Sequence, residues 1–141
     1  MSDAPDPPAA APAAPRVLLV DDNPINQLVA REMLASLGVD VDTAADGEEA
    51  LARLALGAYA LVFMDVMMPR LDGLEATRQW RRHEERARAR RVPIVALTAN
   101  AMAADRERCL AAGMDDYLAK PVRREQLAQM LARWLPDAPP A

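Results

Sequence analysis

Several residue types are scarce in this chain, and each scarcity excludes a class of protein. The 141 residues include one cysteine, Cys109, so no internal disulfide can form and a reducing compartment is indicated. Every stretch without a charged residue, 54–64 among them, is shorter than the roughly 20 residues that a membrane-spanning helix needs. The N-terminus has acidic residues and no basic flank, so a signal peptide is not predicted. We therefore expect a cytoplasmic protein.

Histidine and aromatic residues are also rare. His83 is the only histidine and has no partner acid at catalytic spacing, so we do not expect it to donate phosphate. The net charge of -4 argues against nucleic acid as the main partner. Seven basic residues lie between Arg78 and Arg91, but no aromatic residues alternate with them. We interpret this stretch as a solvated helix face, and Cys109 as a packing residue.

Composition divides the chain into three parts. Residues 1–15 are almost wholly alanine, proline and aspartate, which is typical of a disordered linker or tail. Residues 137–141 form a short C-terminal tail. The remainder, 16–136, is long enough to bury one hydrophobic core, and we predict a single domain there.

Short apolar runs alternate with helical patterns through this domain. We predict five strands, at 16–20, 39–43, 60–64, 93–97 and 116–119. Asn23-Pro24 begins a helix that ends at Gly38, with an apolar stripe formed by Ile25, Leu28, Val29, Met33 and Leu37. Two further helices begin at the capping-box pairs Asp46/Glu49 and Asp72/Glu75. A fourth helix is expected over 103–112, and a fifth ends before Pro136. This alternation predicts an α/β fold, a parallel sheet covered by helices on both faces.

Four of the apolar runs end on polar residues suited to metal and phosphate. Asp21 and Asp22 follow the first run, Asp65 the third, Thr98 the fourth and Lys120 the fifth. The carboxyl ends of parallel strands share one edge of a sheet, where ligands bind in open α/β folds. Three carboxylates brought together repel one another, and a hard divalent cation such as Mg²⁺ relieves this. The sequence therefore predicts a metal-assisted phosphoryl-transfer site.

Lys120 stands out among the basic residues. The chain has 17 lysines and arginines, and all the others are arginines. A lysine ammonium is a compact point charge that can reach a single oxygen where a guanidinium is too broad. We interpret its position at a strand end as a functional choice.

Four segments resemble the receiver domain of two-component response regulators. They are VLLVDDN at 17–23, VFMDVMMP at 62–69, ALTAN at 96–100 and YLAKP at 117–121. The match covers about 16–136 and looks closest to receivers fused to hybrid sensor histidine kinases. The resemblance implies a flavodoxin-like, doubly wound sheet with strand order 2-1-3-4-5 and five helices. It also implies a bacterial, cytoplasmic signalling protein.

The resemblance implies a role for each polar residue. Asp65 is the expected phosphoacceptor, taking phosphate from a histidine kinase or a histidine phosphotransfer protein. Asp21, Asp22, Asp65 and the Met67 backbone carbonyl are expected to hold Mg²⁺ or Mn²⁺, and Thr98 and Lys120 the phosphoryl oxygens. Thr98 and Tyr117 are the expected switch pair, changing the surface of the fourth helix, fifth strand and fifth helix for a downstream protein. Lys120-Pro121 is expected to be a cis peptide.

Two other functions fit parts of this pattern. A phosphatase of the haloacid dehalogenase type also uses a nucleophilic aspartate, but it carries an acid two residues later, where this chain has Met67. A degenerate receiver would lack acidic or basic site residues. We therefore expect no enzyme beyond self-phosphorylation and weak autodephosphorylation. Met67 and Asn100 occupy the positions expected to tune phosphate loss, and we hypothesise that Met67 slows it.

Overall fold

The structure is a computed structural model that describes residues 15–67, 71–99 and 103–135. The predicted tails lie outside these ranges, except for Pro15, and so does Asn100. Five strands and five helices alternate along the described residues: β1 Arg16–Val20, α1 Pro24–Ser36, β2 Asp40–Ala44, α2 Gly47–Leu56, β3 Leu61–Asp65, α3 Gly73–Ala87, β4 Ile94–Thr98, α4 Ala103–Ala112, β5 Asp116–Ala119 and α5 Arg124–Trp134.

The strands form one parallel sheet in the order β2-β1-β3-β4-β5. This order confirms the flavodoxin-like fold. β1, β3 and β4 lie inside the sheet, and four of the five β1 residues and all residues of β3 and β4 are buried, as strands covered on both faces must be. β2 is an edge strand and is half exposed, in agreement with its alternating sequence.

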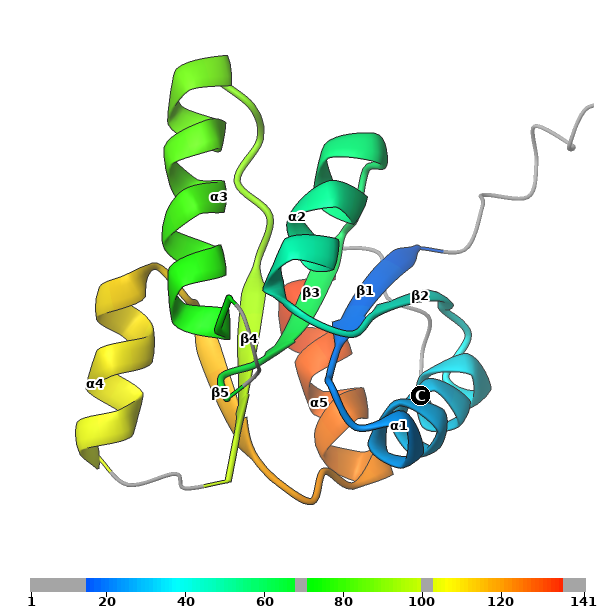
Figure 1. The fold of residues 1–141 in the computed structure, drawn as a ribbon. Helices are drawn as coiled ribbons and strands as arrows, with labels where there is room; N and C mark the ends of the chain where they lie inside the picture. The colour runs from blue at the N-terminus through cyan, green and yellow to red at the C-terminus, as the bar shows by residue number, and fades with distance from the viewer. Residues whose placement is uncertain (1–14, 68–70, 100–102, 136–141) are drawn as a thin grey trace, which may run out of the picture.

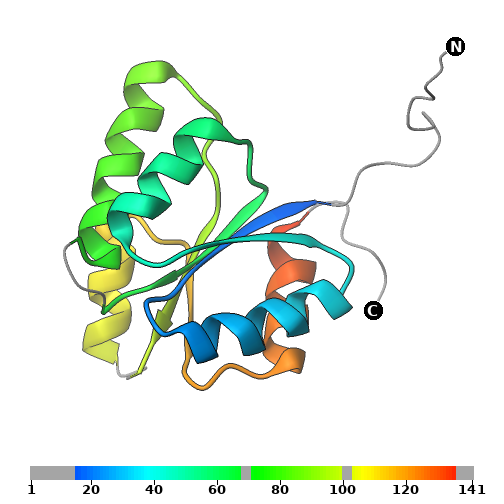
Figure 2. The same cartoon turned by 45° about the vertical axis from the view of Figure 1, so that its right-hand side comes forward.

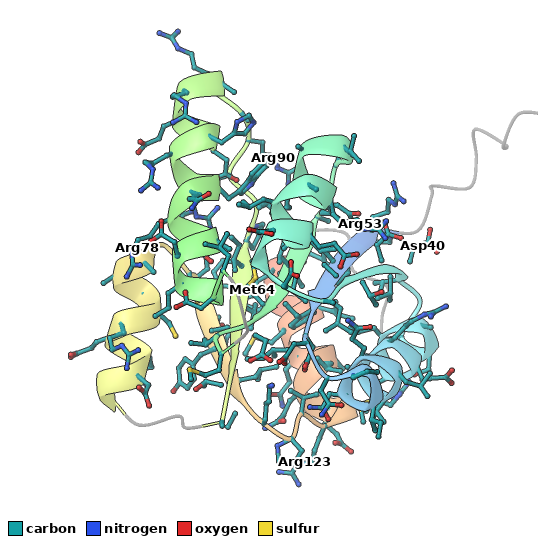
Figure 3. The ribbon with its side chains drawn as sticks, viewed as in Figure 1. Asp40, Arg53, Met64, Arg78, Arg90 and Arg123 are labelled. Atoms are coloured by element: carbon teal, nitrogen blue, oxygen red, sulfur yellow. The ribbon has the colours of Figure 1, made fainter. Side chains whose placement is uncertain are left out.

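Helices cover both faces of the sheet. α1 and α5 pack on one face and α2, α3 and α4 on the other (Figures 1 and 2). Successive strand residues contribute to opposite faces: Leu61 and Phe63 pack toward α1 and α5, whereas Val62 and Met64 pack toward the other three helices. Figure 3 shows Met64 in the interior, with Arg78 at the outer surface.

The second, third and fourth predicted strands are each displaced by one residue in the structure, the second to Asp40–Ala44. β3 ends on Asp65 and β4 ends on Thr98, so both functional residues belong to the strands and do not follow them. Asp65 pairs with Leu97 in the ladder, and Val66 N donates to the Leu97 carbonyl at 3.0 Å. The ladder with β4 therefore holds the Asp65 backbone in place.

The prediction of one apolar stripe on α1 was wrong in part. Ala30 and Leu34 are the buried residues, while Ile25, Leu28 and Val29 are 71%, 55% and 46% exposed. Residues four apart on a helix form a row inclined to the helix axis, so the predicted row turns from solvent toward the core along α1. Its later members, Met33 and Leu37, do pack against the core.

The predicted capping boxes form only in part. Asp46 accepts from Glu49 N at 2.8 Å, but the Glu49 carboxylate accepts from Ala45 N, one residue before the cap. Asp72 accepts from Glu75 N at 2.9 Å, whereas Glu75 accepts from the side chains of Arg78 and Gln79. A long acidic side chain on a first turn can reach arginine on the next turn, and here this contact replaces the return bond to the backbone.

The basic stretch on α3 is exposed with one exception. Arg81 is only 11% exposed and donates to the carboxylates of Glu84 and Asp115, both at 2.8 Å. The prediction of a fully solvated face was therefore wrong at Arg81, which ties α3 to the connection before β5. None of the helices within the described ranges has the length and apolar character needed to cross a membrane.

Candidate functional site

Three carboxylates meet at the carboxyl edge of the sheet, as predicted. Asp21 and Asp22 follow β1, and Asp65 ends β3. One oxygen from each lies within 4.8 Å of the others. Asp21 and Asp65 are 3% and 2% exposed, whereas Asp22 is exposed. Carboxylates this close repel one another, and burial strengthens the repulsion because little water screens it.

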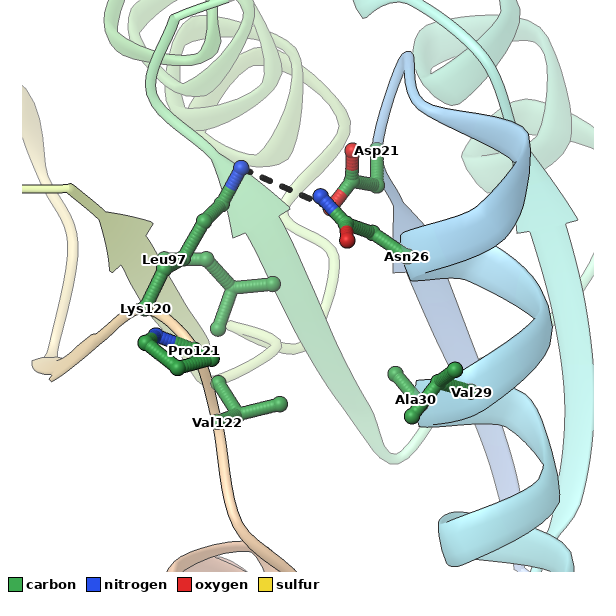
Figure 4. Close-up of a pocket in the computed structure, with 8 residues that line it drawn as sticks. All are labelled: Asp21, Asn26, Val29, Ala30, Leu97, Lys120, Pro121 and Val122. Carbon is green, nitrogen blue, oxygen red and sulfur yellow. Dashed lines mark ion pairs between the residues drawn. The ribbon is translucent and has the colours of Figure 1, made fainter.

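Lys120 supplies positive charge to this cluster. It follows β5, and its ammonium nitrogen lies 2.8 Å from Asp65 Oδ2 and 3.5 Å from Asp21 Oδ2. Figure 4 shows Lys120 and Asp21 pointing toward each other, with their ion pair as a dashed line. With the acids ionised, a single ammonium leaves two of the cluster's negative charges without a basic partner among these four side chains.

Burial and charge act on Asp65 and Lys120 together. Burial raises the pKa of Asp65, and the opposing hydrogen bond and charge of Lys120 do not cancel this effect. For Lys120, burial alone would lower the pKa, but Asp65 and Asp21 more than offset it and the pKa is raised. The Asp65 carboxylate thus lies where its charge is disfavoured, and a further cation would stabilise it.

Thr98 and Tyr117 lie on neighbouring strands. Thr98 is the buried last residue of β4, and its carbonyl accepts from Lys120 N at 2.8 Å. Tyr117 pairs with Ala96 in the ladder and is half-buried. Its hydroxyl accepts from Arg106 Nη1 at 2.8 Å, and the Arg106 guanidinium lies 5.3 Å from the ring centre. Tyr117 is therefore held toward α4.

Met67 lies at the opening of the site. Its side chain is 72% exposed, and its backbone N–H donates to Asp65 Oδ1 at 3.3 Å. This bond and that from Lys120 engage the two Asp65 oxygens separately. The other predicted tuning residue, Asn100, lies outside the described residues.

A cavity of about 420 Å³ adjoins the acidic cluster. It is lined on one side by Asp21 and by Asn26, Val29 and Ala30 of α1, and on the other by Leu97 and the segment Lys120, Pro121, Val122 (Figure 4). The Lys120-Pro121 peptide bond is cis, as predicted. Because α1 residues line the cavity, it leaves the acidic cluster open on the side of α1.

Two residues that support the site were missed by the sequence analysis. Gly73 begins α3, where a Cβ atom would overlap the Asp65 carbonyl oxygen. Glycine is the residue that allows a close backbone approach, so its presence at this helix start was the available signal in the sequence. Gln27 donates from its side-chain amide to the carbonyls of Asp21 and Ala44. Nothing in its sequence context distinguishes it from other helix glutamines.

The residues of this cluster fit a magnesium ion. All three donors are hard carboxylate oxygens, few enough to leave room for water and phosphate oxygens, as Mg²⁺ prefers. Burial raises the pKa of Asp65, and a cation beside this carboxylate would offset the effect. Asp21, Asp22 and Asp65 are the side chains that could hold the ion.

Comparisons with known proteins agree with this site. The sequence profile of the response regulator receiver domain matches residues 17–132. The sensor protein GacS of Pseudomonas syringae is 46% identical over 121 residues, which cover 86% of this chain and 13% of GacS. The sensor histidine kinase RcsC of Salmonella typhi is 42% identical over 82% of this chain and 12% of its own length. The chain thus spans about an eighth of these relatives.

Solved structures show the same fold. A receiver domain of a sensor histidine kinase from Pseudomonas aeruginosa, with a magnesium ion coordinated in its active-site cleft, is 51% identical. The similarity covers 86% of this chain and 98% of that one, with a TM-score of 0.77. A Saccharomyces cerevisiae response regulator receiver, crystallised with a histidine phosphotransfer protein, is 34% identical with a TM-score of 0.82, covering 86% and 89%. On its fold, its acidic cluster and these matches, the chain belongs to the family of response regulator receiver domains.

Proposed function

We propose that this domain accepts a phosphoryl group from a phosphohistidine onto Asp65 and thereby changes its surface. One observation carries the proposal: a buried aspartate lies beside two further acids and is contacted by the only lysine of the chain. A structural ion pair would need neither the second nor the third acid. Two buried acids beside one ammonium, with a third acid next to them, are a costly surplus of negative charge unless a bound cation offsets it.

In the proposed reaction a carboxylate oxygen of Asp65 attacks phosphorus, and the bond from phosphorus to the histidine nitrogen breaks. An acyl phosphate forms, and the imidazole leaves with the electron pair of the broken bond. Lys120, now 2.8 Å from Asp65, would shift its contact to a phosphoryl oxygen. The Thr98 hydroxyl, on the adjacent strand, would donate to another. Catalysis then consists of positioning and charge neutralisation.

Asp21, Asp22 and Asp65 would hold Mg²⁺, together with the backbone carbonyl of Met67. The bound ion supplies charge neutralisation for the phosphoryl oxygens. Manganese has the same preference for oxygen ligands and would substitute for it. Burial disfavours the negative charge of Asp65 and raises its pKa. A bound cation would offset this effect, which supports the assignment.

We propose a phosphoacceptor and not an enzyme that turns over an external substrate. A hydrolase of the haloacid dehalogenase type places an acid two residues after its nucleophile, and here Met67 points its thioether into solvent instead. No proton donor or acceptor is therefore available from that position. Autodephosphorylation is expected to be weak.

The exposed apolar residues of α1 support a phosphodonor protein as the partner. Ile25, Leu28 and Val29 are exposed, and Val29 also lines the cavity beside Asp21 and Lys120. A protein that docks here would place its phosphohistidine at the open side of the site. A histidine kinase or a histidine phosphotransfer protein fits, and we propose that the domain is a cytoplasmic module of a bacterial hybrid kinase, in keeping with its similarity to the sensor protein GacS and the sensor histidine kinase RcsC.

We propose the face formed by α4, β5 and α5 as the output surface. A hollow of about 650 Å³ lies there, and Arg106, Leu110, Tyr117, Met130 and Arg133 line it. Phosphorylation would draw Thr98 toward the phosphate, and Tyr117 would turn inward and leave Arg106. A downstream protein would then meet a changed surface.

The first test is labelling by a small phosphodonor with Mg²⁺, followed by intact mass measurement. The wild type is expected to gain one phosphoryl group and Asp65→Asn none, while the exposed control Asp40→Asn labels normally. Equal labelling of wild type and Asp65→Asn would remove Asp65 from its assigned role.

A second test separates docking from chemistry. Leu28→Arg is expected to slow transfer from a phosphorylated histidine phosphotransfer protein without changing labelling by the small donor. Leu56→Arg is the matched control, because Leu56 is 87% exposed on α2, on the other face of the sheet. If both variants receive phosphate from the protein at the wild-type rate, α1 is not the docking face.

A further inference from the structure

Gln27 joins two segments that the sheet brings together. It lies near the start of α1, and its side-chain nitrogen is 2.7 Å from the Asp21 carbonyl oxygen and 3.0 Å from the Ala44 carbonyl oxygen. Asp21 follows β1, and Ala44 ends β2. A primary amide has two N–H donors, and here each can point to one carbonyl. The side chain is thus a clamp between the β1–α1 loop and the edge strand.

The same clamp fixes the conformation of Asp21. Its backbone N–H donates to the Ala44 carbonyl at 3.0 Å, and its carbonyl accepts from Gln27. One carboxylate oxygen accepts from Asn23 N at 2.9 Å, and the other faces Lys120 at 3.5 Å. Each polar group of Asp21 therefore has a partner, and Gln27 provides the one that reaches across from α1.

This loop needs support because of the charges it carries. Asp21 and Asp22 both lie within 4.8 Å of an Asp65 oxygen, and repulsion between these carboxylates pushes the loop away from β3. The two hydrogen bonds of the clamp attach the loop to α1 and to the end of β2, and so limit how far the loop can move in response to that repulsion. Because Gln27 is uncharged, it supplies this restraint without adding a positive charge that would compete with a metal ion.

We propose that Gln27 is a positioning residue that preorganises Asp21 and Asp22 for Mg²⁺. The inference rests on the proposed function, since it assigns Gln27 a role in the same metal site. Gln27 contacts neither the ion nor the phosphoryl group. It lowers the cost of bringing two acids together before the ion arrives, so its removal weakens ion binding and leaves the fold in place.

The test measures Mg²⁺ binding directly, by titrating the full chain with Mg²⁺ and following backbone amide NMR shifts. Gln27→Met keeps the length of the side chain and removes both donors. We expect its Kd for Mg²⁺ to rise about threefold to tenfold, the range that loss of one or two neutral hydrogen bonds produces. Hydrogen exchange at the Asp21 amide is expected to quicken. Gln79→Met, the same change on α3, is the control and keeps the wild-type Kd.

A kinetic measurement distinguishes positioning from stability. For Gln27→Met, the Mg²⁺ concentration that half-saturates labelling by a small phosphodonor should rise, while the rate at saturating Mg²⁺ stays near that of the wild type. Gln27→Asn, one methylene too short to reach both carbonyls, is expected to behave in the same way and serves if the methionine variant does not fold.

Two failures are separable. If the wild type binds Mg²⁺ and both Gln27 variants bind it with unchanged Kd, the role of Gln27 is overturned and the metal site stands. If the wild type itself shows no Mg²⁺ binding, the metal site fails and the role of Gln27 fails with it.

Discussion

The ammonium nitrogen of Lys120 lies 2.8 Å from Asp65 Oδ2, across 55 residues of sequence. This contact occupies an oxygen of the proposed phosphoacceptor. It links the carboxyl ends of β3 and β5 at the same edge of the sheet. It also compensates part of the negative charge of a nearly buried acid. Lys120 therefore contributes to the stability of the fold and is also expected to take part in phosphoryl transfer.

Lys120→Met should reveal how much this contact contributes to the free energy of unfolding. In EDTA we expect the free energy of unfolding to fall by about 2 kcal/mol, because two buried acids lose their cation. This value lies between those typical of exposed and of buried ion pairs. With Mg²⁺ the loss should shrink, since the ion supplies the missing charge and stabilises the folded state by mass action. Urea unfolding in both conditions measures this, with Arg123→Met as an exposed control. A loss of equal size in EDTA and Mg²⁺ would contradict the prediction.

Arg106 should bias the switch. It holds Tyr117 outward through a hydrogen bond and a stacked guanidinium. In Arg106→Ala the inward position of Tyr117 should become more populated, and labelling by a small phosphodonor should quicken about two- to fivefold, as loss of roughly 1 kcal/mol predicts. Arg108→Ala, which breaks only a surface pair with Asp105, is the control. Unchanged labelling in both variants would show that the contact does not influence phosphorylation.

Glu84 should be a strong determinant of stability. It is 5% exposed, and its two oxygens accept from Arg81 Nη1 at 2.8 Å and from Val92 N at 2.9 Å. An amide has only one oxygen, so Glu84→Gln leaves one buried donor facing an NH₂ group. We expect a loss of about 2 kcal/mol in thermal or urea unfolding. The exposed neighbour variant Glu85→Gln should change stability little, and equal effects would refute the distinction.

Tyr59 predicts a pH dependence in alkali. Burial and the hydrogen bond to Asp42 raise the pKa of Tyr59 from 10.0 to about 12. The folded state thus favours the neutral phenol, so this stabilisation is complete below about pH 10 and is lost as pH rises toward 12. Tyr59→Phe should be about 1 kcal/mol less stable at neutral pH, and the difference should vanish in alkali. A difference that stays constant through this range would contradict the assignment.

Met67 should lengthen the life of the acyl phosphate. Its exposed thioether cannot orient a water molecule for attack, whereas an amide can. Met67→Asn is expected to lose phosphate roughly threefold faster or more, measured as the decay of labelled protein after removal of donor. Met67→Leu keeps an apolar side chain and should decay at the wild-type rate. Decay of Met67→Asn at the parent rate would remove this role.

Local patterns in the sequence were sufficient for the elements and for most site residues. Asp21, Asp65, Thr98 and Lys120 could be found because each ends an apolar run, and parallel strands bring such ends to one edge. Asn23-Pro24 and Gly38 likewise marked the ends of α1, because caps act over a few residues.

Contacts between distant segments could not be predicted in the same way. Arg81 appeared to be one more surface arginine, yet it bonds to Gly113 and Asp115, more than 30 residues away. The sequence predicts one apolar stripe on α1, but the face that α1 packs against the sheet decides which of these residues are buried. Which residues are buried, and which distant residues contact one another, depends on how the helices and strands pack.

The sequence by itself determined the alternation of strands and helices and the chemical character of the sheet edge, because hydrophobic period, caps and strand ends are local properties. Only the tertiary structure decided that Gln27 clamps Asp21 to Ala44, that Lys120 rests on Asp65, and that Arg106 restrains Tyr117. These contacts arise from strand order and helix docking, which place residues together that no short-range pattern connects.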